Sequence, residues 1–304
     1  MRVERGVLLF TLIALAACSS SARRDANPGI GARARTLEAA SMENALRGDL
    51  TRAASLQERA VAAYRSIDDV AGVAAGLNRL GNLQQSAEDR AAAERSYGEA
   101  RDLARLGGAS GEEAAAENNL GTLVEEGGDT QKAREHYEAA LRLAHAGSAR
   151  SVEAAAENNL GLLALAAGDL ADAQRRFDAA LAIDREIGDR AGEATRLRNL
   201  GALHRRKGSS TEAIRHLEQA HEIDRKREDV AAIALDLVSL SEVRAESRGD
   251  LARAVDERRR ARDIHRLLGD REAAEHDEAV IEAWCGQLGS SAPLACVEVR
   301  RTGL

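Results

Sequence analysis

Seven histidines are the residues of this chain best suited to acid–base or metal chemistry, but their spacing supports neither. His216 and His221 are five residues apart, which is poor geometry for one metal on one helical face, and no H-E-x-x-H motif occurs. Nucleophile-elbow, Walker and dinucleotide-binding motifs do not occur either. The sequence therefore predicts no enzyme, no metal site, no cofactor and no small-molecule substrate. The seven histidines are His136, His145, His204, His216, His221, His265 and His276.

Asparagine amides offer a different chemistry, because they recur beside a repeated Leu-Gly pair. The segment EAAAENNLG spans residues 113–121 and returns at residues 153–161. An Asn side chain carries two donors and an acceptor, so it can pair with the main chain of an extended peptide whatever the peptide's sequence. The candidates are Asn78, Asn118, Asn119, Asn158, Asn159 and Asn199.

Charged residues beside the same pairs differ between repeats. Arg198, Arg205 and Arg206 lie near one Leu-Gly pair, and Glu125 and Glu126 lie near another. Such a difference could orient a bound segment, with its acidic end toward the arginines. The alternative is a solvated face with no partner. The overall net charge of −7 is mild and spread along the chain, which gives no sign of nucleic-acid binding.

The three cysteines divide into one near the start and two near the end. Cys18 follows a largely apolar run, residues 7–17, which would rise about 16 Å as a helix and is too short to span a bilayer alone. Residues 15–18, Leu-Ala-Ala-Cys, resemble the lipobox of bacterial lipoproteins. That resemblance implies a signal peptide over residues 1–17 and an acylated Cys18, with sorting to the outer membrane implied by Ser19. An ordinary secretory signal or a buried N-terminal helix is the alternative.

The remaining cysteines, Cys285 and Cys296, form a pair that an oxidising compartment would join in a disulfide. The ten residues between them contain glycines and Pro293, which would let the tail (residues 289–304) fold back on the last helix. Two unrelated free thiols are the alternative. The spacing is not C-x-x-C, so the bridge would be structural rather than redox-active.

Helices must position these residues. The long stretch between Pro28 and Pro293 contains no proline and is rich in Ala, Glu, Arg and Leu. Leu-Gly pairs recur every 40 residues from Leu80 to Leu200, and Gly-Asp or Gly-Ser pairs between them predict a C-cap followed by an N-cap. A fixed period in this range is typical of a stacked repeat.

The pattern Leu-Gly, then Gly, then Ala-x3-aromatic resembles the tetratricopeptide repeat, a helix–turn–helix unit. Ala133 precedes Tyr137 and Ala173 precedes Phe177 in this pattern. The 40-residue period and the Asn-Asn-Leu-Gly segment resemble the kinesin light chain subgroup, from which Glu117 and Glu157 depart because an apolar residue is usual there. The resemblance implies an all-α, right-handed superhelix of six helix pairs over residues 32–288, with a closing helix at residues 271–288 and a flexible tether at residues 18–31.

The same resemblance implies that the first helix of each pair lines a concave wall, and that the asparagines and arginines named above face it. One Asn of each pair is expected to face the wall and the other to help packing; the alternative is that some amides cap or cross-link helices. We therefore expect a lipid-anchored scaffold or assembly factor of the bacterial cell envelope that binds a partner polypeptide. A self-associating structural element and a cytoplasmic regulator with a misread N-terminus are the other hypotheses.

Overall fold

The computed structural model describes residues 28–247, 250–288 and 296, and each regular element in those ranges is an α-helix. This confirms the predicted all-α class. The chain divides into two compact units, Met1–Leu163 and Ala164–Leu304, with the boundary inside the seventh helix.

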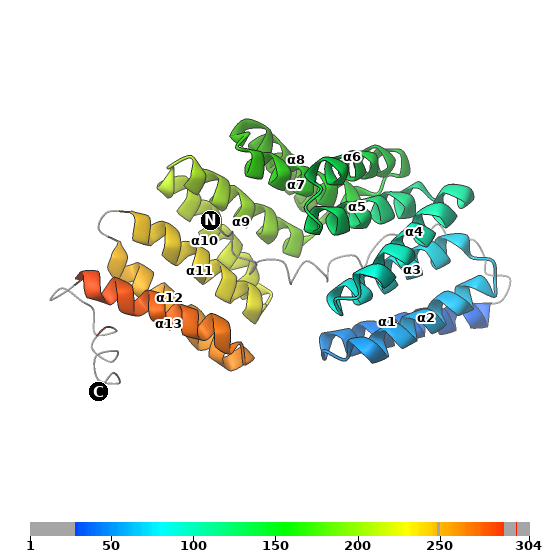
Figure 1. Cartoon of the computed structure of the whole chain (residues 1–304), viewed down its shortest axis with the longest axis horizontal. Coiled ribbons are helices and arrows are strands. Elements are labelled where there is room, and N and C mark those ends of the chain that lie inside the picture. The colour runs from blue at the N-terminus through cyan, green and yellow to red at the C-terminus, as the bar shows by residue number, and fades with distance from the viewer. Residues whose placement is uncertain (1–27, 248–249, 289–295, 297–304) are drawn as a thin grey trace. The chain divides into compact units, whose positions relative to one another are not determined.

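In the first unit, consecutive helices are joined by short turns and pack side by side, so that they alternate in direction (Figure 1). Helices α1 and α2, α3 and α4, and α5 and α6 form hairpins, and α3 also contacts α5 directly. The helices are α1 (Pro28–Leu46), α2 (Leu50–Arg65), α3 (Val70–Ser86), α4 (Arg90–Gly107), α5 (Ser110–Glu126), α6 (Thr130–Gly147) and the first part of α7 (Arg150–Ala167).

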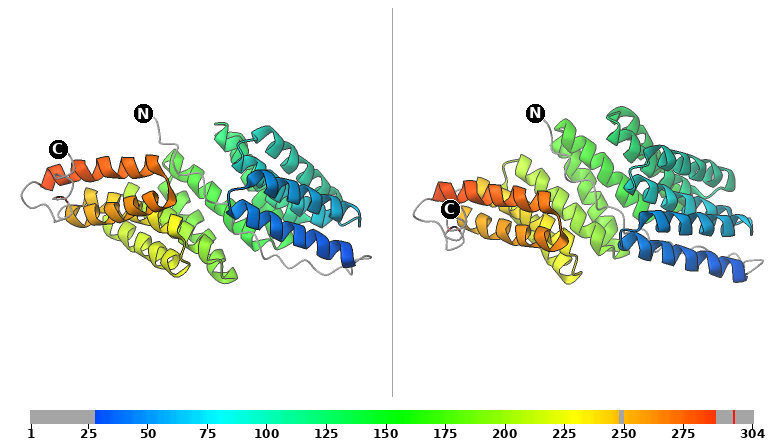
Figure 2. Two further views of the ribbon diagram at one scale, coloured as in Figure 1. Left: turned by 90° about the horizontal axis from the view of Figure 1, so that it is seen from below. Right: turned by 60° about the horizontal axis from the view of Figure 1, so that its bottom comes forward.

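The second unit has the same serial arrangement. Helix α9 contacts α8, α10 and also α11, while α12 and α13 lie side by side in both views of Figure 2. Six helix pairs and a closing helix are present in the described residues, as predicted, and the closing helix has the predicted bounds. The helices are α8 (Leu170–Ile187), α9 (Arg190–Arg206), α10 (Ser210–Lys226), α11 (Val230–Glu246), α12 (Leu251–Leu268) and α13 (Arg271–Leu288).

The turns recur about every 20 residues, and most of them contain a residue in the left-handed region. Gly128 and Gly168 have φ values of 89° and 84°, and Glu88 and Glu228 adopt the same region at 61° and 55°. In most of these turns an Asp follows as the N-cap, and its carboxylate accepts the backbone N–H three residues later, as at Asp129. A cap of this kind contributes about 1 kcal/mol, so the turn chemistry helps to fix the length of the helices.

The core is built from the predicted Leu-Gly and Ala-x3-aromatic positions. Leu80 and Tyr97 are buried, and the backbone of α3 approaches the Tyr97 ring so closely that a Cβ on Gly81 would lie 2.4 Å from Cε1. Gly121 packs against Tyr137 in the same way. Glycine at these positions therefore lets a helix pair close around an aromatic ring.

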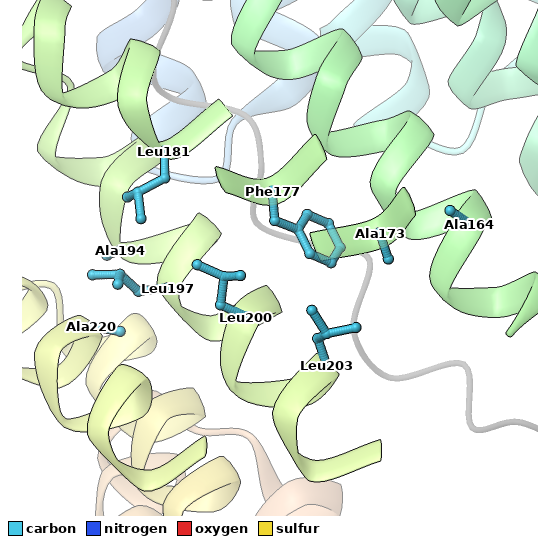
Figure 3. Close-up of a cluster of buried hydrophobic side chains, with 9 residues drawn as sticks. All are labelled: Ala164, Ala173, Phe177, Leu181, Ala194, Leu197, Leu200, Leu203 and Ala220. Atoms are coloured by element: carbon cyan, nitrogen blue, oxygen red, sulfur yellow. The ribbon is translucent and has the colours of Figure 1, made fainter. Parts of the chain in front are cut away.

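In the second unit the same layer uses smaller or more flexible side chains. Phe177 of α8 packs with Leu200 and Leu203 of α9 in a cluster of nine buried residues (Figure 3). In the next hairpin Leu217 replaces the ring and packs against Gly201. The buried layer is continuous within the unit although its aromatic content falls.

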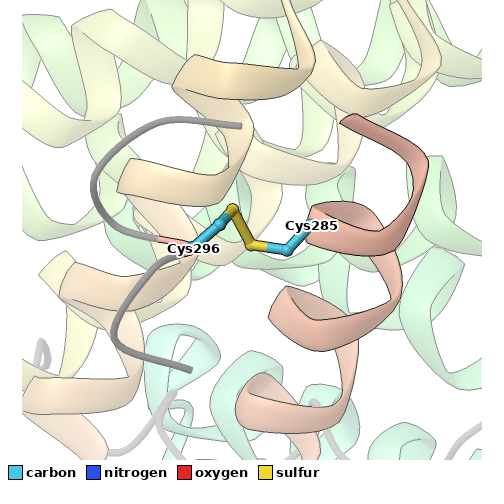
Figure 4. The surroundings of a disulfide bond; sticks show 2 residues. All are labelled: Cys285 and Cys296. Atoms are coloured by element: carbon cyan, nitrogen blue, oxygen red, sulfur yellow. A yellow bond between two sulfur atoms is a disulfide. The ribbon is translucent and has the colours of Figure 1, made fainter. Parts of the chain in front are cut away.

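The end of the second unit is closed by a disulfide. Cys285 of α13 is bonded to Cys296, with their Cα atoms 5.5 Å apart (Figure 4). Both cysteines are buried in a cluster with Val255 and Ile281, and Trp284 packs against it. The bridge therefore places Cys296 against the last helix, while the rest of the predicted tail, residues 289–295 and 297–304, lies outside the described residues.

One predicted boundary needs correction. Helix α1 begins at Pro28, so residues 28–31 belong to the first helix and not to the tether predicted for residues 18–31. Proline is favoured at a first helical position because its missing N–H would be unpaired there anyway. The predicted signal peptide and the lipid-attachment residue Cys18 lie outside the described residues.

Candidate functional site

The candidate site lies on the first helices of successive pairs in the first unit. Residues directly after each Leu-Gly pair, such as Asn82 and Thr122, are half-buried, and so are Asn119 and Asn159 just before the pairs. Because α3 and α5 contact each other directly, their side chains at these positions form one continuous surface. We call this surface of α3, α5 and α7 up to Leu163 the amide wall.

The amides of this wall are hydrogen-bonded to one another across neighbouring helices. The Asn159 Nδ2 of α7 donates to Asn118 Oδ1 of α5 over 3.0 Å. The Asn119 Nδ2 of α5 donates to Asn82 Oδ1 of α3 over 3.3 Å. A row of amides therefore crosses three helices, and each member keeps part of its surface exposed.

Two of the predicted wall residues are packing residues instead, which corrects the prediction. Asn78 and Asn158 are only 6% and 5% exposed. The Asn78 Nδ2 donates to the backbone oxygen of Glu112 over 3.1 Å and so joins α3 to α5. The Asn158 Nδ2 donates to Asn159 Oδ1 over 3.3 Å. In the pair at 158 and 159 one amide packs and the other faces the wall, as expected, whereas Asn118 and Asn119 are both half-buried.

In the second unit the predicted arginines are engaged in contacts between helices, which is a second correction. The Arg198 Nη1 lies 2.5 Å from Asp224 Oδ2 and 3.0 Å from Asp236 Oδ1, and both carboxylates are fully buried. Arg205 pairs with Glu242 and Glu246 of α11. Arg206 and Asn199 also have partners within the chain; that of Arg206 is the backbone oxygen of Leu165.

These contacts change the expected electrostatics of the wall. Burial raises the pKa of the Asp236 carboxyl to about 7, although the Arg198 guanidinium beside it acts in the opposite direction. The charges of Arg198 and Arg205 are matched by carboxylates of the next helices, so neither is a free cation for a ligand. The idea that Arg198, Arg205 and Arg206 orient a bound segment against Glu125 and Glu126 stays an untested prediction.

The unusual Glu117 is accommodated by partners on the second helices. Its Oε2 lies 2.7 Å from His136 Nδ1 of α6, and its Oε1 lies 3.7 Å from Arg105 Nη2 of α4. A buried carboxylate is tolerated only when it is paired, so this cluster explains how a charge replaces the apolar residue usual in the repeat. It belongs to the packing of the hairpins and not to the amide wall.

Sequence reasoning missed Asn82, Thr122 and the two tyrosine hydroxyls beside them. The Tyr97 hydroxyl lies 2.7 Å from Asn82 Oδ1. The Tyr137 hydroxyl lies 2.6 Å from Glu125 Oε2 and 3.4 Å from Thr122 Oγ1. The signal was available, because Asn82 and Thr122 each follow a Leu-Gly pair at the same repeat position.

Neither a metal cluster nor a membrane span is present in the described part of the chain. Among residues 28–247, 250–288 and 296, no cluster of three or more His, Cys, Asp or Glu side chains is arranged to hold a metal ion. In the same ranges, no helix combines the length and apolar character that crossing a membrane requires.

Comparison with known proteins gives one family and several structures. A family model of the tetratricopeptide repeat matches residues 72–146 and 152–226. A Rap protein complexed with competence and sporulation factor superposes with a TM-score of 0.60 at 17% identity, over 84% of this chain and 75% of that one. Comparison with curated protein sequences gives no match.

Two other solved structures have a similar fold. BtubC (BKLC) from P. vanneervenii gives a TM-score of 0.58 at 21% identity, over 79% of this chain and 92% of that one. A signal transduction ATPase with a tetratricopeptide repeat sensor, PH0952 from Pyrococcus horikoshii, gives 0.64 at 12% identity, over 88% of this chain and 42% of that one. At these identities the likeness concerns the fold alone.

Proposed function

Because the chain is a tetratricopeptide repeat protein, we propose that it binds a polypeptide segment of a partner protein along the amide wall. The observation that carries this proposal is the row of half-buried amides that crosses α3, α5 and α7. Amides complement the donors and acceptors of a peptide main chain, so such a row can hold an extended segment with little dependence on its side chains. The Rap protein of similar fold, which forms a complex with competence and sporulation factor, supports this choice of ligand.

The amide wall retains groups that a ligand could use. Within the described residues, Asn118 Nδ2 and Asn119 Oδ1 make no hydrogen bond to the protein, whereas the opposite ends of these two side chains are bonded within the row. Each amide is thus held at one end and available at the other. Side chains that are already ordered lose less conformational entropy when a ligand binds.

A peptide probe tests the proposal directly. A random twelve-residue peptide library would be selected against the full chain, and the affinity of an enriched peptide measured by fluorescence anisotropy. We expect Asn119→Ala to weaken binding about fivefold, which corresponds to one lost hydrogen bond. Glu94→Ala, on the exposed face of α4, is the matched control and should leave the affinity within twofold. An affinity insensitive to both Asn118→Ala and Asn119→Ala would refute the proposal.

Cross-linking locates the partner surface in cells. A photoreactive amino acid at Asn159 should form a cross-linked complex, and the same residue at Glu94 should not. Cross-links obtained only from Glu94 would transfer the binding surface to the second helices and contradict the amide-wall proposal.

We further propose that the protein is a scaffold or assembly factor anchored in the bacterial cell envelope through an acylated Cys18, facing the periplasm from the outer membrane. The disulfide between Cys285 and Cys296 supports an oxidising compartment. Labelling with a palmitate analogue, abolished in Cys18→Ala, tests the anchor. Absence of the label from the unchanged chain would instead favour a cytoplasmic regulator.

Self-association is the alternative role for the stack. Size-exclusion chromatography at several concentrations separates the two, because a self-associating element would change its elution volume with concentration while a monomeric scaffold would not.

A further inference from the structure

Buried tyrosines lie behind the amide wall. The Tyr97 ring is fully buried between α3 and α4, and its hydroxyl reaches the wall side of α3, where it lies 2.7 Å from Asn82 Oδ1 and 3.0 Å from Gln85 Oε1. Burial raises the pKa of Tyr97 well above its usual value, so the hydroxyl keeps its proton and acts as a donor. A single donor therefore stands behind this part of the wall.

The distances indicate which end of the Asn82 amide faces the tyrosine. A separation of 2.7 Å is typical of O–H···O hydrogen bonds and is at the short limit for N–H···O bonds. It therefore assigns Asn82 Oδ1, and not Nδ2, to the Tyr97 hydroxyl. The same oxygen accepts from Asn119 Nδ2, so both of its lone pairs are used. In the described part of the chain Asn82 Nδ2 makes no hydrogen bond to the protein, which leaves its donors for the wall surface.

Asn82 and Asn119 together form a pair of opposite polarity. Asn82 offers its Nδ2 donors from α3, and Asn119 offers its Oδ1 acceptor from α5, because the remaining ends of the two amides are bonded to each other. One peptide group of an extended chain presents a carbonyl acceptor and, beyond it, an N–H donor. The pair therefore has the complementary groups for a main chain and for no particular side chain.

The other repeats show that the buried hydroxyl accompanies a polar wall position. Tyr137 stands at the same repeat position as Tyr97, and Thr122 at that of Asn82. In the next two repeats the tyrosine position holds Phe177 and Leu217, and the wall position holds the apolar residues Leu162 and Ala202. A hydroxyl is thus present where the wall needs a hydrogen-bond partner and is lost where it does not.

We propose that the Tyr97 hydroxyl is a positioning group that turns the Asn82 amide outward, so that α3 donates a hydrogen bond to a main-chain carbonyl of the bound segment. This inference rests on the proposed function of the amide wall. It assigns to a residue with no exposed surface a role in ligand affinity.

The test compares two buried hydroxyls in the full chain, using the peptide selected above. Tyr97→Phe should weaken binding about fivefold, the equivalent of one hydrogen bond. Tyr137→Phe is the matched control: it removes a hydroxyl from an equally buried ring, but that hydroxyl contacts Glu125 and orients no amide of the row. It should leave the affinity within twofold.

A double variant separates positioning from a general structural role. If Tyr97 acts through Asn82, adding Tyr97→Phe to Asn82→Ala should produce no further loss of affinity. A further fivefold loss in that background would show that Tyr97 acts through the fold at large, and the inference would be wrong. A Tyr97→Phe variant that binds as tightly as the unchanged chain, while Asn119→Ala still weakens binding, would refute the inference but leave the proposed function standing.

A ligand-free measurement keeps the two failures distinct. The side-chain amide signal of Asn82, assigned by its loss in Asn82→Ala, should shift in the ¹⁵N–¹H spectrum of Tyr97→Phe and stay in place in Tyr137→Phe. If peptide binding proves independent of the asparagines, the proposed function fails, and this spectrum decides alone whether Tyr97 orients Asn82. An unchanged Asn82 signal in Tyr97→Phe overturns the inference.

Discussion

Replacing Gly81 with alanine should destabilise the first unit, although the substitution improves helix propensity. A Cβ at Gly81 would lie 2.4 Å from Cε1, 2.6 Å from Cδ1 and 2.9 Å from Cζ of Tyr97. The ring is fully buried, so it cannot move away without shifting α4. Overpacking of this kind costs up to about 3 kcal/mol. Helix propensity returns about 1 kcal/mol, which leaves a net loss of about 2 kcal/mol.

Two other glycines provide the controls. Gly98 lies inside α4, and a Cβ added there would have no neighbouring atom within 4 Å, so Gly98→Ala should stabilise the unit by up to about 1 kcal/mol. Gly201 faces the Leu217 side chain, whose Cγ would lie 2.7 Å from an added Cβ. Because leucine can change rotamer and a buried ring cannot, Gly201→Ala should cost less than Gly81→Ala.

Thermal and urea unfolding of the three variants measure this order. A loss of about 2 kcal/mol lowers the Tm of a unit of this size by about 4–8 °C. Combining Gly81→Ala with Tyr97→Leu, which copies the pairing of Gly201 with Leu217, should recover part of the loss. If Gly81→Ala raises stability as Gly98→Ala does, the claim that glycine is needed for close approach to the ring is refuted.

Two further predictions concern the second unit. Cys285→Ser should lower the free energy of unfolding by about 3 kcal/mol, because the bridge closes a short loop, and an unchanged urea midpoint would contradict this. The native pKa of Asp236, about 7, exceeds its ordinary value of 3.8, so the folded state holds a proton that the unfolded state has released between those pH values. Stability should therefore fall by up to about 4 kcal/mol as pH rises from about 4 to 7. Asp236→Asn should show a smaller fall in urea titrations, and equal falls would show that this carboxyl does not titrate as described.

The repeat period allowed the fold to be predicted, but it did not reveal which side chains meet across neighbouring repeats. Leu80, Leu120 and Leu160 are buried as their spacing requires, and α13 has its predicted bounds. The asparagine at 78 could not be assigned in this way, because its partner is the backbone of Glu112 in the following repeat. A period defines equivalent positions, whereas burial depends on what the next helix places opposite them.

The arginine at 198 could have been assigned with one more observation. Its partner Asp236 stands where earlier repeats have Ala116 and Ala156, and the nearby Arg196 occupies the same repeat position in α9. A charge in a position otherwise reserved for alanine indicates a buried ion pair. Arg196 shows the same behaviour, since its Nε lies 3.1 Å from the buried carboxylate of Asp184.

The left-handed residues between helices have a consequence for how such a chain can lengthen. Gly108, Gly128 and Ser148 follow one another at intervals of 20, so inner and outer helices are terminated by the same device. A duplication of 20 residues would close its turns correctly but would exchange the two kinds of helix from that point onward. The tyrosines and the amides would then stand on the wrong members of each pair. Growth that preserves a usable surface is therefore restricted to whole pairs, even though the turns themselves permit half of one.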